Sequence, residues 1–148
     1  KVAIRNIRKD SNNKIKKFYN QINLVYTVFS FITIIVVYYI IYGLNQLEHI
    51  QYLEDFIKGY TPFVYWIAAL SYALLVHSLI NVLFIFSFSR QTFALKSIFL
   101  ATLVNIIFGL ILSRGIALEY SVIGLLIGAI VFWYYSFRYT MKMFNNLE

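Results

Sequence analysis

The sequence predicts an all-α integral membrane protein with about four transmembrane helices. Hydrophobic residues make up 61% of its 148 residues and charged residues only 13%, against about 45–50% and about 25% in an average soluble domain. A soluble protein would have to expose this excess of apolar surface to water. The basic residues also gather at the ends of long uncharged stretches, as in membrane proteins. The net charge of +7 therefore does not indicate a nucleic-acid partner, which requires basic residues on a solvated face.

Uncharged stretches of sequence define the four spans. No charged residue lies in the stretches from Lys17 to Glu48, Lys58 to Arg90, Lys96 to Arg114 and Glu119 to Arg138. A helix needs about 20 apolar residues to cross a hydrocarbon layer of about 30 Å. We therefore expect a transmembrane region over residues 24–144, with helices at 24–44, 63–86, 93–112 and 122–139. The last two stretches are slightly short, but their flanking basic side chains can reach the interface.

The segments outside the spans have their own patterns. Residues 1–23 are predicted to form a basic cytoplasmic segment. This segment can form an amphipathic helix, whose basic face suits anionic lipid headgroups. Residues 45–60 carry apolar side chains at helical spacing, so they are either an interfacial helix or an ordered outer loop. Thr61-Pro62 is a good start for the second helix, and Gly43 is placed to end the first.

The distribution of lysine and arginine predicts the orientation. Eleven of the thirteen basic residues lie before the first span, between the second and third, or at the C-terminal end. Lys58 and Arg114 alone lie on the other side. Because basic residues favour the cytoplasmic side, both ends of this chain are expected in the cytoplasm.

Small residues recur in the third and fourth spans. The third has one at every fourth position: Ser97, Ala101, Asn105, Gly109 and Ser113. The fourth has Gly124 and Gly128, a GxxxG pair. Such spacing lets two helix backbones approach closely. One interpretation is simple helix packing, and the other is a seam that slides or rocks during transport.

Polar side chains inside the spans are the candidate functional residues. His77 and Asn81 are four residues apart and share one face of the second helix, and Asn105 lies in the middle of the third. They could line a polar cavity and bind sugar hydroxyls, or they could bond to neighbouring helices and hold the bundle together. No metal site is predicted, since the only other histidine is His49 in the outer segment. No cofactor site or catalytic residue is predicted either, because no acidic residue or nucleophile motif lies in the spans.

The C-terminal half resembles a known transporter family. The residues that carry the resemblance are LKSIFLATLVNIIFGLILSRGIALEYSVIGLLIGAIV, residues 95–131, with a mid-helix Asn105, a short loop and the Gly124/Gly128 helix. The basic connection FSFSRQTFAL and the closing MFNNLE are also similar. These features resemble the last helices of polysaccharide flippases in the MATE-like superfamily, closest to the Pel exopolysaccharide transporter (PelG-like) family. That family's usual Asp is replaced around Ser87–Ser89.

The resemblance implies export or flipping of exopolysaccharide or lipid-linked sugar across the bacterial inner membrane by alternating access. Such transporters have twelve or more helices, so this chain, which begins at Lys1, is expected to be a C-terminal part. Membrane lipid, the polysaccharide and a cytoplasmic glycosyltransferase or other export subunits are the expected partners. The alternative is a complete four-helix accessory protein of cell-envelope glycosylation, similar to the GtrA-like proteins. Nothing in the residues favours an enzyme.

Overall fold

Four long helices make up nearly all of the described chain. The computed structural model describes residues 2–45 and 61–145. Its elements are α1 (Val2–Asn45), α3 (Thr61–Ser87), α4 (Gln91–Gly115), the 3₁₀ turn η1 (Leu118–Tyr120) and α5 (Ser121–Asn145). The outer loop or interfacial helix expected at 45–60 lies, apart from Asn45, outside the described residues.

All four helices are long and apolar enough to cross a membrane. The qualifying stretches have mean hydropathies between 1.6 and 2.4 and run over Lys9–Gly43, Pro62–Ser87, Gln91–Gly115 and Leu118–Asn145. At 1.5 Å per residue, even a helix of 25 residues is longer than the ~30 Å hydrocarbon layer. The prediction of four apolar helices is thus confirmed.

The helices are longer than the spans inferred from the uncharged stretches. The basic segment 1–23 and the span 24–44 form one continuous helix of 44 residues. No proline or glycine interrupts α1 before Gly43, so nothing in the backbone separates the basic part from the apolar part. At the other end of the chain, α5 continues six residues beyond the predicted limit of 139, and it buries Thr140, Met143 and Phe144 there.

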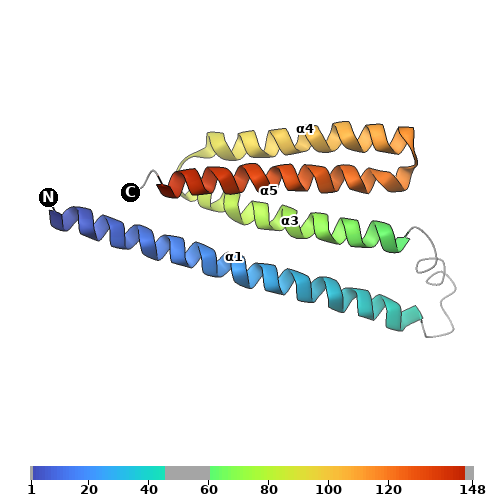
Figure 1. The fold of residues 1–148 in the computed structure, drawn as a ribbon, viewed down its shortest axis with the longest axis horizontal. Helices are drawn as coiled ribbons and strands as arrows, with labels where there is room; N and C mark the ends of the chain where they lie inside the picture. The colour runs from blue at the N-terminus through green and yellow to red at the C-terminus, as the bar shows by residue number, and fades with distance from the viewer. Residues whose placement is uncertain (1, 46–60, 146–148) are drawn as a thin grey trace.

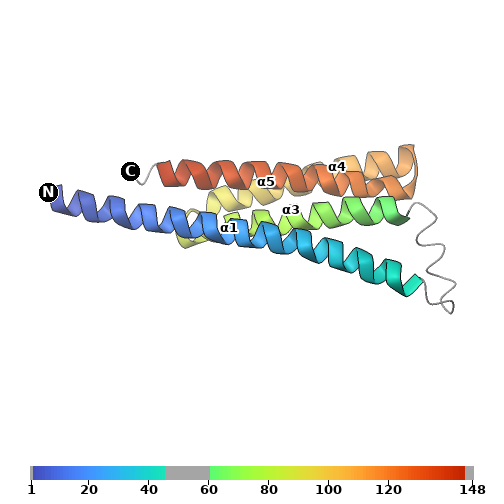
Figure 2. The ribbon, with the colours of Figure 1, turned by 60° about the horizontal axis from the view of Figure 1, so that its bottom comes forward.

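The helices run alternately up and down (Figure 1). Helix α5 lies between α3 and α4, and α1 lies beside α3. The two chain ends and the α3–α4 turn share one end of the bundle, here called the termini end, whereas η1 lies at the opposite, far end. Figure 2 gives the same arrangement from another side and shows the start of α1 extending past the end of α5.

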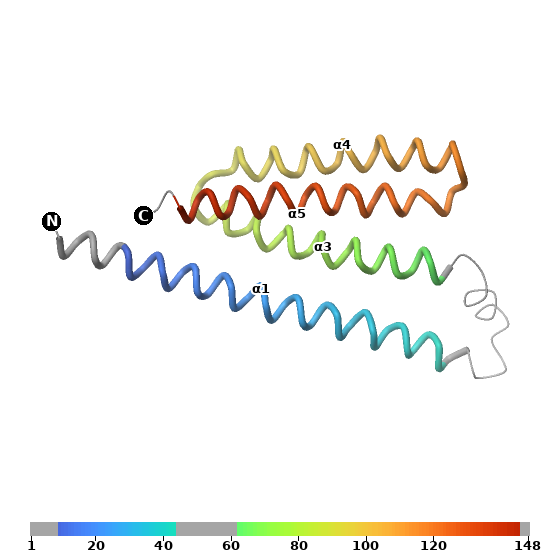
Figure 3. Tube along the Cα trace, in the orientation of Figure 1, coloured from blue at the N-terminus to red at the C-terminus, as the bar shows by residue number. Residues whose placement is uncertain are grey.

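The main apolar cluster of the buried core is formed by α3, α4 and α5. Its apolar members are Val82, Ile85, Ala94, Ala101 and Phe132. The ring of Phe93 stacks on Tyr139 with their centroids 4.9 Å apart, next to this core. In contrast, no residue of the most apolar stretch of α1 is buried within the described part of the chain. Figure 3 shows that α1 separates from α3 toward the far end.

Candidate functional site

Four buried polar side chains join three helices near the termini end. They are Tyr19 on α1, Asn81 on α3, and Ser136 and Thr140 on α5, and we call them the polar node. The Tyr19 hydroxyl donates to Oδ1 of Asn81 over 2.5 Å, and Nδ2 of Asn81 donates to Oγ of Ser136 over 3.2 Å. None of the four is more than 1% exposed.

The remaining hydrogen bonds of the node tie its hydroxyls to the backbone. The Thr140 hydroxyl lies 2.9 Å from the Ser136 carbonyl oxygen and 3.4 Å from that of Asn81. The Ser136 hydroxyl donates to the Trp133 carbonyl oxygen over 3.1 Å. Both polar atoms of the Asn81 side chain thus have protein partners, as buried polar groups require. This geometry gives Asn81 a role in joining helices, and Asn81 lines none of the hollows described below.

Aromatic rings enclose the node on the α1 side. The Tyr19 ring meets Phe84 and Phe144 edge-on, with centroid distances of 4.9 and 5.3 Å. Edge-to-face pairs of this kind add a favourable quadrupole interaction to the apolar area that they bury. Tyr19 therefore fixes α1 to α3 and α5 both by a hydrogen bond and by ring packing.

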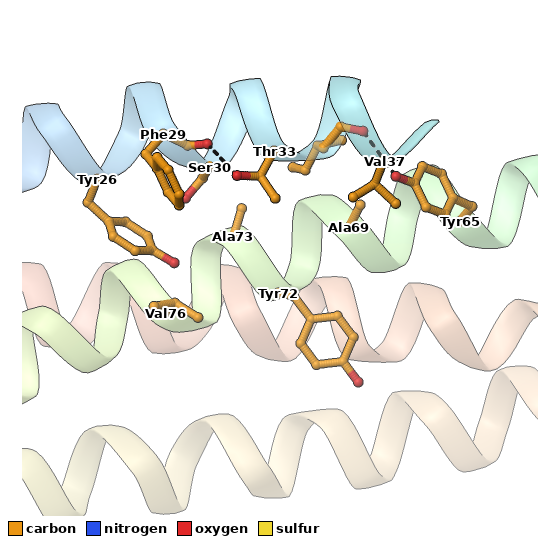
Figure 4. A pocket seen from close by; sticks show the side chains of 11 residues that line it. Tyr26, Phe29, Ser30, Thr33, Val37, Tyr65, Ala69, Tyr72, Ala73 and Val76 are labelled. Atoms are coloured by element: carbon orange, nitrogen blue, oxygen red, sulfur yellow. Dashed lines mark hydrogen bonds between the residues drawn. The ribbon is translucent and has the colours of Figure 1, made fainter. Parts of the chain in front are cut away.

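Two hollows lie on either side of the α1–α3 contact, further toward the far end. The first, of about 280 Å³, is the tyrosine hollow (Figure 4). It is lined by Tyr26, Phe29, Ser30, Thr33, Ile34 and Val37 of α1 and by Tyr65, Ala69, Tyr72, Ala73 and Val76 of α3. The small side chains of Ala69 and Ala73 face α1, while Tyr72 points away from it (Figure 4). The Tyr65 hydroxyl donates to the Ile34 carbonyl oxygen over 3.0 Å and links the two helices there.

The second, the histidine hollow, has a volume of about 240 Å³ and includes His77. Its other lining residues are Tyr26, Thr27, Ser30, Phe31, Leu70, Ala73, Leu74 and Trp133. The two hollows share Tyr26, Ser30 and Ala73. His77 and Asn81 thus lie on one helix but have different surroundings, because His77 lines the histidine hollow and Asn81 belongs to the node.

Two buried oxygen atoms on α1 have no hydrogen-bond partner within the described residues. They are Oγ of Ser30 and Oδ1 of Asn23. The two residues are seven apart and so lie on one face of α1, and Ser30 lines both hollows. Between them, the Thr27 hydroxyl donates to the Asn23 carbonyl oxygen over 2.7 Å. Because an unpaired buried polar atom costs free energy, each such atom in a native structure calls for an explanation.

The small residues of α4 and α5 form a close backbone contact. A Cβ atom added to Gly124 would lie 2.4 Å from the Gly109 backbone nitrogen. A Cβ added to Gly128 would lie 2.7 Å from Cβ of Asn105 and 3.2 Å from the Ala101 carbonyl oxygen. Glycine is therefore the only residue that fits at either position without a shift of the helices. Asn105 belongs to this α4–α5 seam and lines neither hollow.

Residues that the sequence did not single out supply most of the site. Tyr19 falls in the segment assigned to the cytoplasm, and Ser30 and Thr27 are common polar residues of apolar helices. Of the node, the sequence singled out Asn81 alone, and the spacing of Ser136 and Thr140, four apart on one face of α5, was a further signal for it. Within residues 2–45 and 61–145, no group of three or more His, Cys, Asp or Glu side chains could hold a metal ion.

In comparisons with known proteins, no family model, no curated protein and no solved structure matches the chain.

Proposed function

We propose that this chain is a membrane-spanning part of a transporter in the bacterial inner membrane, with both of its ends in the cytoplasm. The substrate is an exopolysaccharide or a lipid-linked sugar, which moves by alternating access. The observation that carries the proposal is the Ser30 hydroxyl, a buried polar group without a partner among the described residues, in the wall shared by the two α1–α3 hollows.

The chemistry of the hollows suits a substrate that is both apolar and hydroxylated. Their lining is mainly aliphatic and aromatic, and it includes the hydroxyl-bearing residues Ser30 and Thr33 and, in one hollow, His77. A few polar groups within an apolar lining are typical of small-molecule sites. Aromatic rings such as Trp133 can stack on sugar rings, while Ser30 and His77 can bond to hydroxyls. An isoprenoid or acyl chain matches the apolar remainder.

The arrangement of α1 supports a rocking movement. The polar node joins α1 to α3 and α5 near the termini end. Toward the far end the backbones of α1 and α3 separate (Figure 1), and there aromatic side chains bridge them, with the ring centroids of Tyr38 and Trp66 4.9 Å apart. A change in the angle of α1 costs little buried packing, because no residue in its most apolar stretch is buried against the described residues. Such a movement would open the α1–α3 hollows toward the far end, as a hinge motion of one element does in other transporters.

The test is a translocation assay in reconstituted vesicles. The protein that contains this chain is incorporated into liposomes with a fluorescent isoprenoid-diphosphate-linked disaccharide, and a membrane-impermeant quencher reports its arrival in the outer leaflet. We expect His77→Leu to slow translocation at least about tenfold, the loss from one or two hydrogen bonds to a substrate hydroxyl. We expect Thr27→Val, which also changes the histidine hollow, to slow it less.

Thr102→Val is the matched control for Thr27→Val. It makes the same isosteric change at an exposed position of α4, away from both hollows. If translocation is unchanged in His77→Leu and Thr27→Val, with normal incorporation, the hollows do not lie on the transport path. A protein that moves no probe in any form, but binds a sugar-transferring partner, would favour the accessory-protein alternative.

A further inference from the structure

Helix α1 carries two further, adjoining hollows of opposite character, each lined by side chains of α1 alone. The first, of about 420 Å³, is the basic hollow, lined by Asn13, Lys16, Lys17, Asn20, Gln21 and Leu24. The second, of about 430 Å³, is the outer apolar hollow, lined by Phe18, Gln21, Ile22, Val25, Tyr26 and Phe29. Gln21 belongs to both, so the two hollows meet there.

Most of the large side chains that line these two hollows are exposed among the described residues. Tyr19, which points toward α3 and α5, is 1% exposed, while its neighbour Phe18 is 57% exposed and Val25 and Phe29 are each 65% exposed. These large side chains directly follow a pair of lysines along the helix. An occupant of both hollows must therefore offer anionic or acceptor atoms at one end and an apolar chain at the other.

We propose that these two hollows bind a membrane lipid with a net-anionic phosphate headgroup. Lys16 and Lys17 supply charge to the phosphate oxygens, and the amides of Asn13, Asn20 and Gln21 can donate hydrogen bonds to the same group. The lipid chain then lies over Phe18, Ile22 and Val25. The charge complementarity selects a lipid headgroup rather than a second apolar helix, which would leave both lysines without an anion.

The position of the lysines along α1 agrees with this assignment. They precede Tyr19, which lies level with Phe144 near the end of α5, and the uncharged stretch of α1 begins directly after them. In a bilayer this is the depth of the headgroups, where each lysine near an anionic surface changes lipid association about fivefold. The outer apolar hollow shares Tyr26 and Phe29 with the tyrosine hollow, but the proposal does not depend on the transport function of the α1–α3 hollows.

The experiment measures lipid preference at the protein surface. The full protein is reconstituted in phosphatidylcholine vesicles with about 1% of either spin-labelled phosphatidylglycerol or spin-labelled phosphatidylcholine. The motionally restricted fraction of each probe gives their relative association. We expect phosphatidylglycerol to be preferred at low salt, and the double variant Lys16→Gln/Lys17→Gln to lower that preference by about fivefold or more.

The matched control removes the same charge from the same helix. Lys9→Gln/Lys14→Gln also changes two lysines of α1, but neither lines the hollows, and we expect it to retain the preference. Equal losses in the two double variants would overturn the proposal, because net charge alone would then explain the attraction. An unchanged preference in Lys16→Gln/Lys17→Gln would overturn it as well. Far-UV circular dichroism verifies that both variants stay helical.

Discussion

The hydroxyl of Tyr19 and the side-chain carbonyl of Asn81, 62 residues apart in the sequence, meet over 2.5 Å with almost no exposed surface. This bond is the centre of the polar node and the principal polar link from α1 to the three-helix core. At the other end of the α1–α3 contact, the Tyr65 hydroxyl donates to the Ile34 carbonyl oxygen, and the Tyr38 ring packs against Trp66 with centroids 4.9 Å apart. The node is therefore the buried polar link of α1 to the core, whereas the second link is a backbone bond and ring packing.

Tyr19→Phe should destabilise the protein by about 1–2 kcal/mol. The variant keeps the ring contacts with Phe84 and Phe144 but leaves Oδ1 of Asn81 buried without a donor, and the cost of such a change between membrane helices is of this size. The measurement is unfolding in mixed detergent micelles followed by circular dichroism. Tyr39→Phe, at a 67% exposed position of the same helix, is the control and should cost nothing measurable. Equal stabilities of the two variants would contradict the node's role.

Ser30→Ala should raise stability and lower transport at the same time. The Ser30 hydroxyl is buried without a partner, so its removal relieves a desolvation cost of about 1 kcal/mol. If the hydroxyl serves the substrate, the vesicle translocation rate falls in the same variant, a trade-off expected at functional sites. The thermal midpoint and the translocation rate are measured on one preparation. A lower midpoint would mean that the hydroxyl has a structural partner outside the described residues.

Gly124→Ala should separate α4 from α5 and destabilise the bundle by about 1–3 kcal/mol, the usual cost of overpacking. The added Cβ would meet backbone atoms of Gly109 at 2.4 and 2.6 Å, which cannot move aside as a flexible side chain can. Gly115→Ala is the matched control, because no atom lies within 4 Å of its added Cβ. Helix propensity alone makes that change neutral or slightly stabilising. The thermal midpoint in detergent should fall in Gly124→Ala and stay unchanged or rise slightly in Gly115→Ala, and equal falls in both variants would refute the close contact.

Ser89→Gly should stabilise the α3–α4 turn. Ser89 has a φ of 57°, the one positive φ among the non-glycine residues that the structure describes. A side chain in this left-handed region costs about 1 kcal/mol, which glycine avoids. A rise of a few degrees in the thermal midpoint is the expected result. A Ser89→Val variant, whose branched side chain fits this conformation poorly, should lower the midpoint instead, and a reversed order would refute the assigned turn.

The coarse fold followed from the sequence because charges and apolar stretches act locally. The gap between Lys58 and Arg90, for example, located α3 to within two residues at its start and one at its end. The ends of α1 and α5 were less predictable. The length of an uncharged stretch indicates which part of a helix can enter hydrocarbon. The helix itself continues until a proline or glycine stops it, as α1 continues through its lysines.

The pairing of residues on different helices could not be predicted in the same way. The sequence grouped His77 with Asn81 because they share a helix face, but the partner of Asn81 is Tyr19, which only the three-dimensional approach of α1 brings near. The glycines were more informative. Gly124 and Gly128 suit close packing whatever their partner is, and in the structure the residues next to them are Gly109, Ala101 and Asn105.

The most direct test of the account is the sidedness of the two ends of the bundle. The chain contains no cysteine, so single cysteines at the exposed positions Thr92, next to the α3–α4 turn, and Glu119, in η1, can be labelled with a membrane-impermeant maleimide. In intact bacteria the account predicts labelling of Glu119→Cys but not of Thr92→Cys. In inverted vesicles it predicts labelling of Thr92→Cys but not of Glu119→Cys. Labelling of both positions from the same face would contradict a chain that crosses the membrane four times.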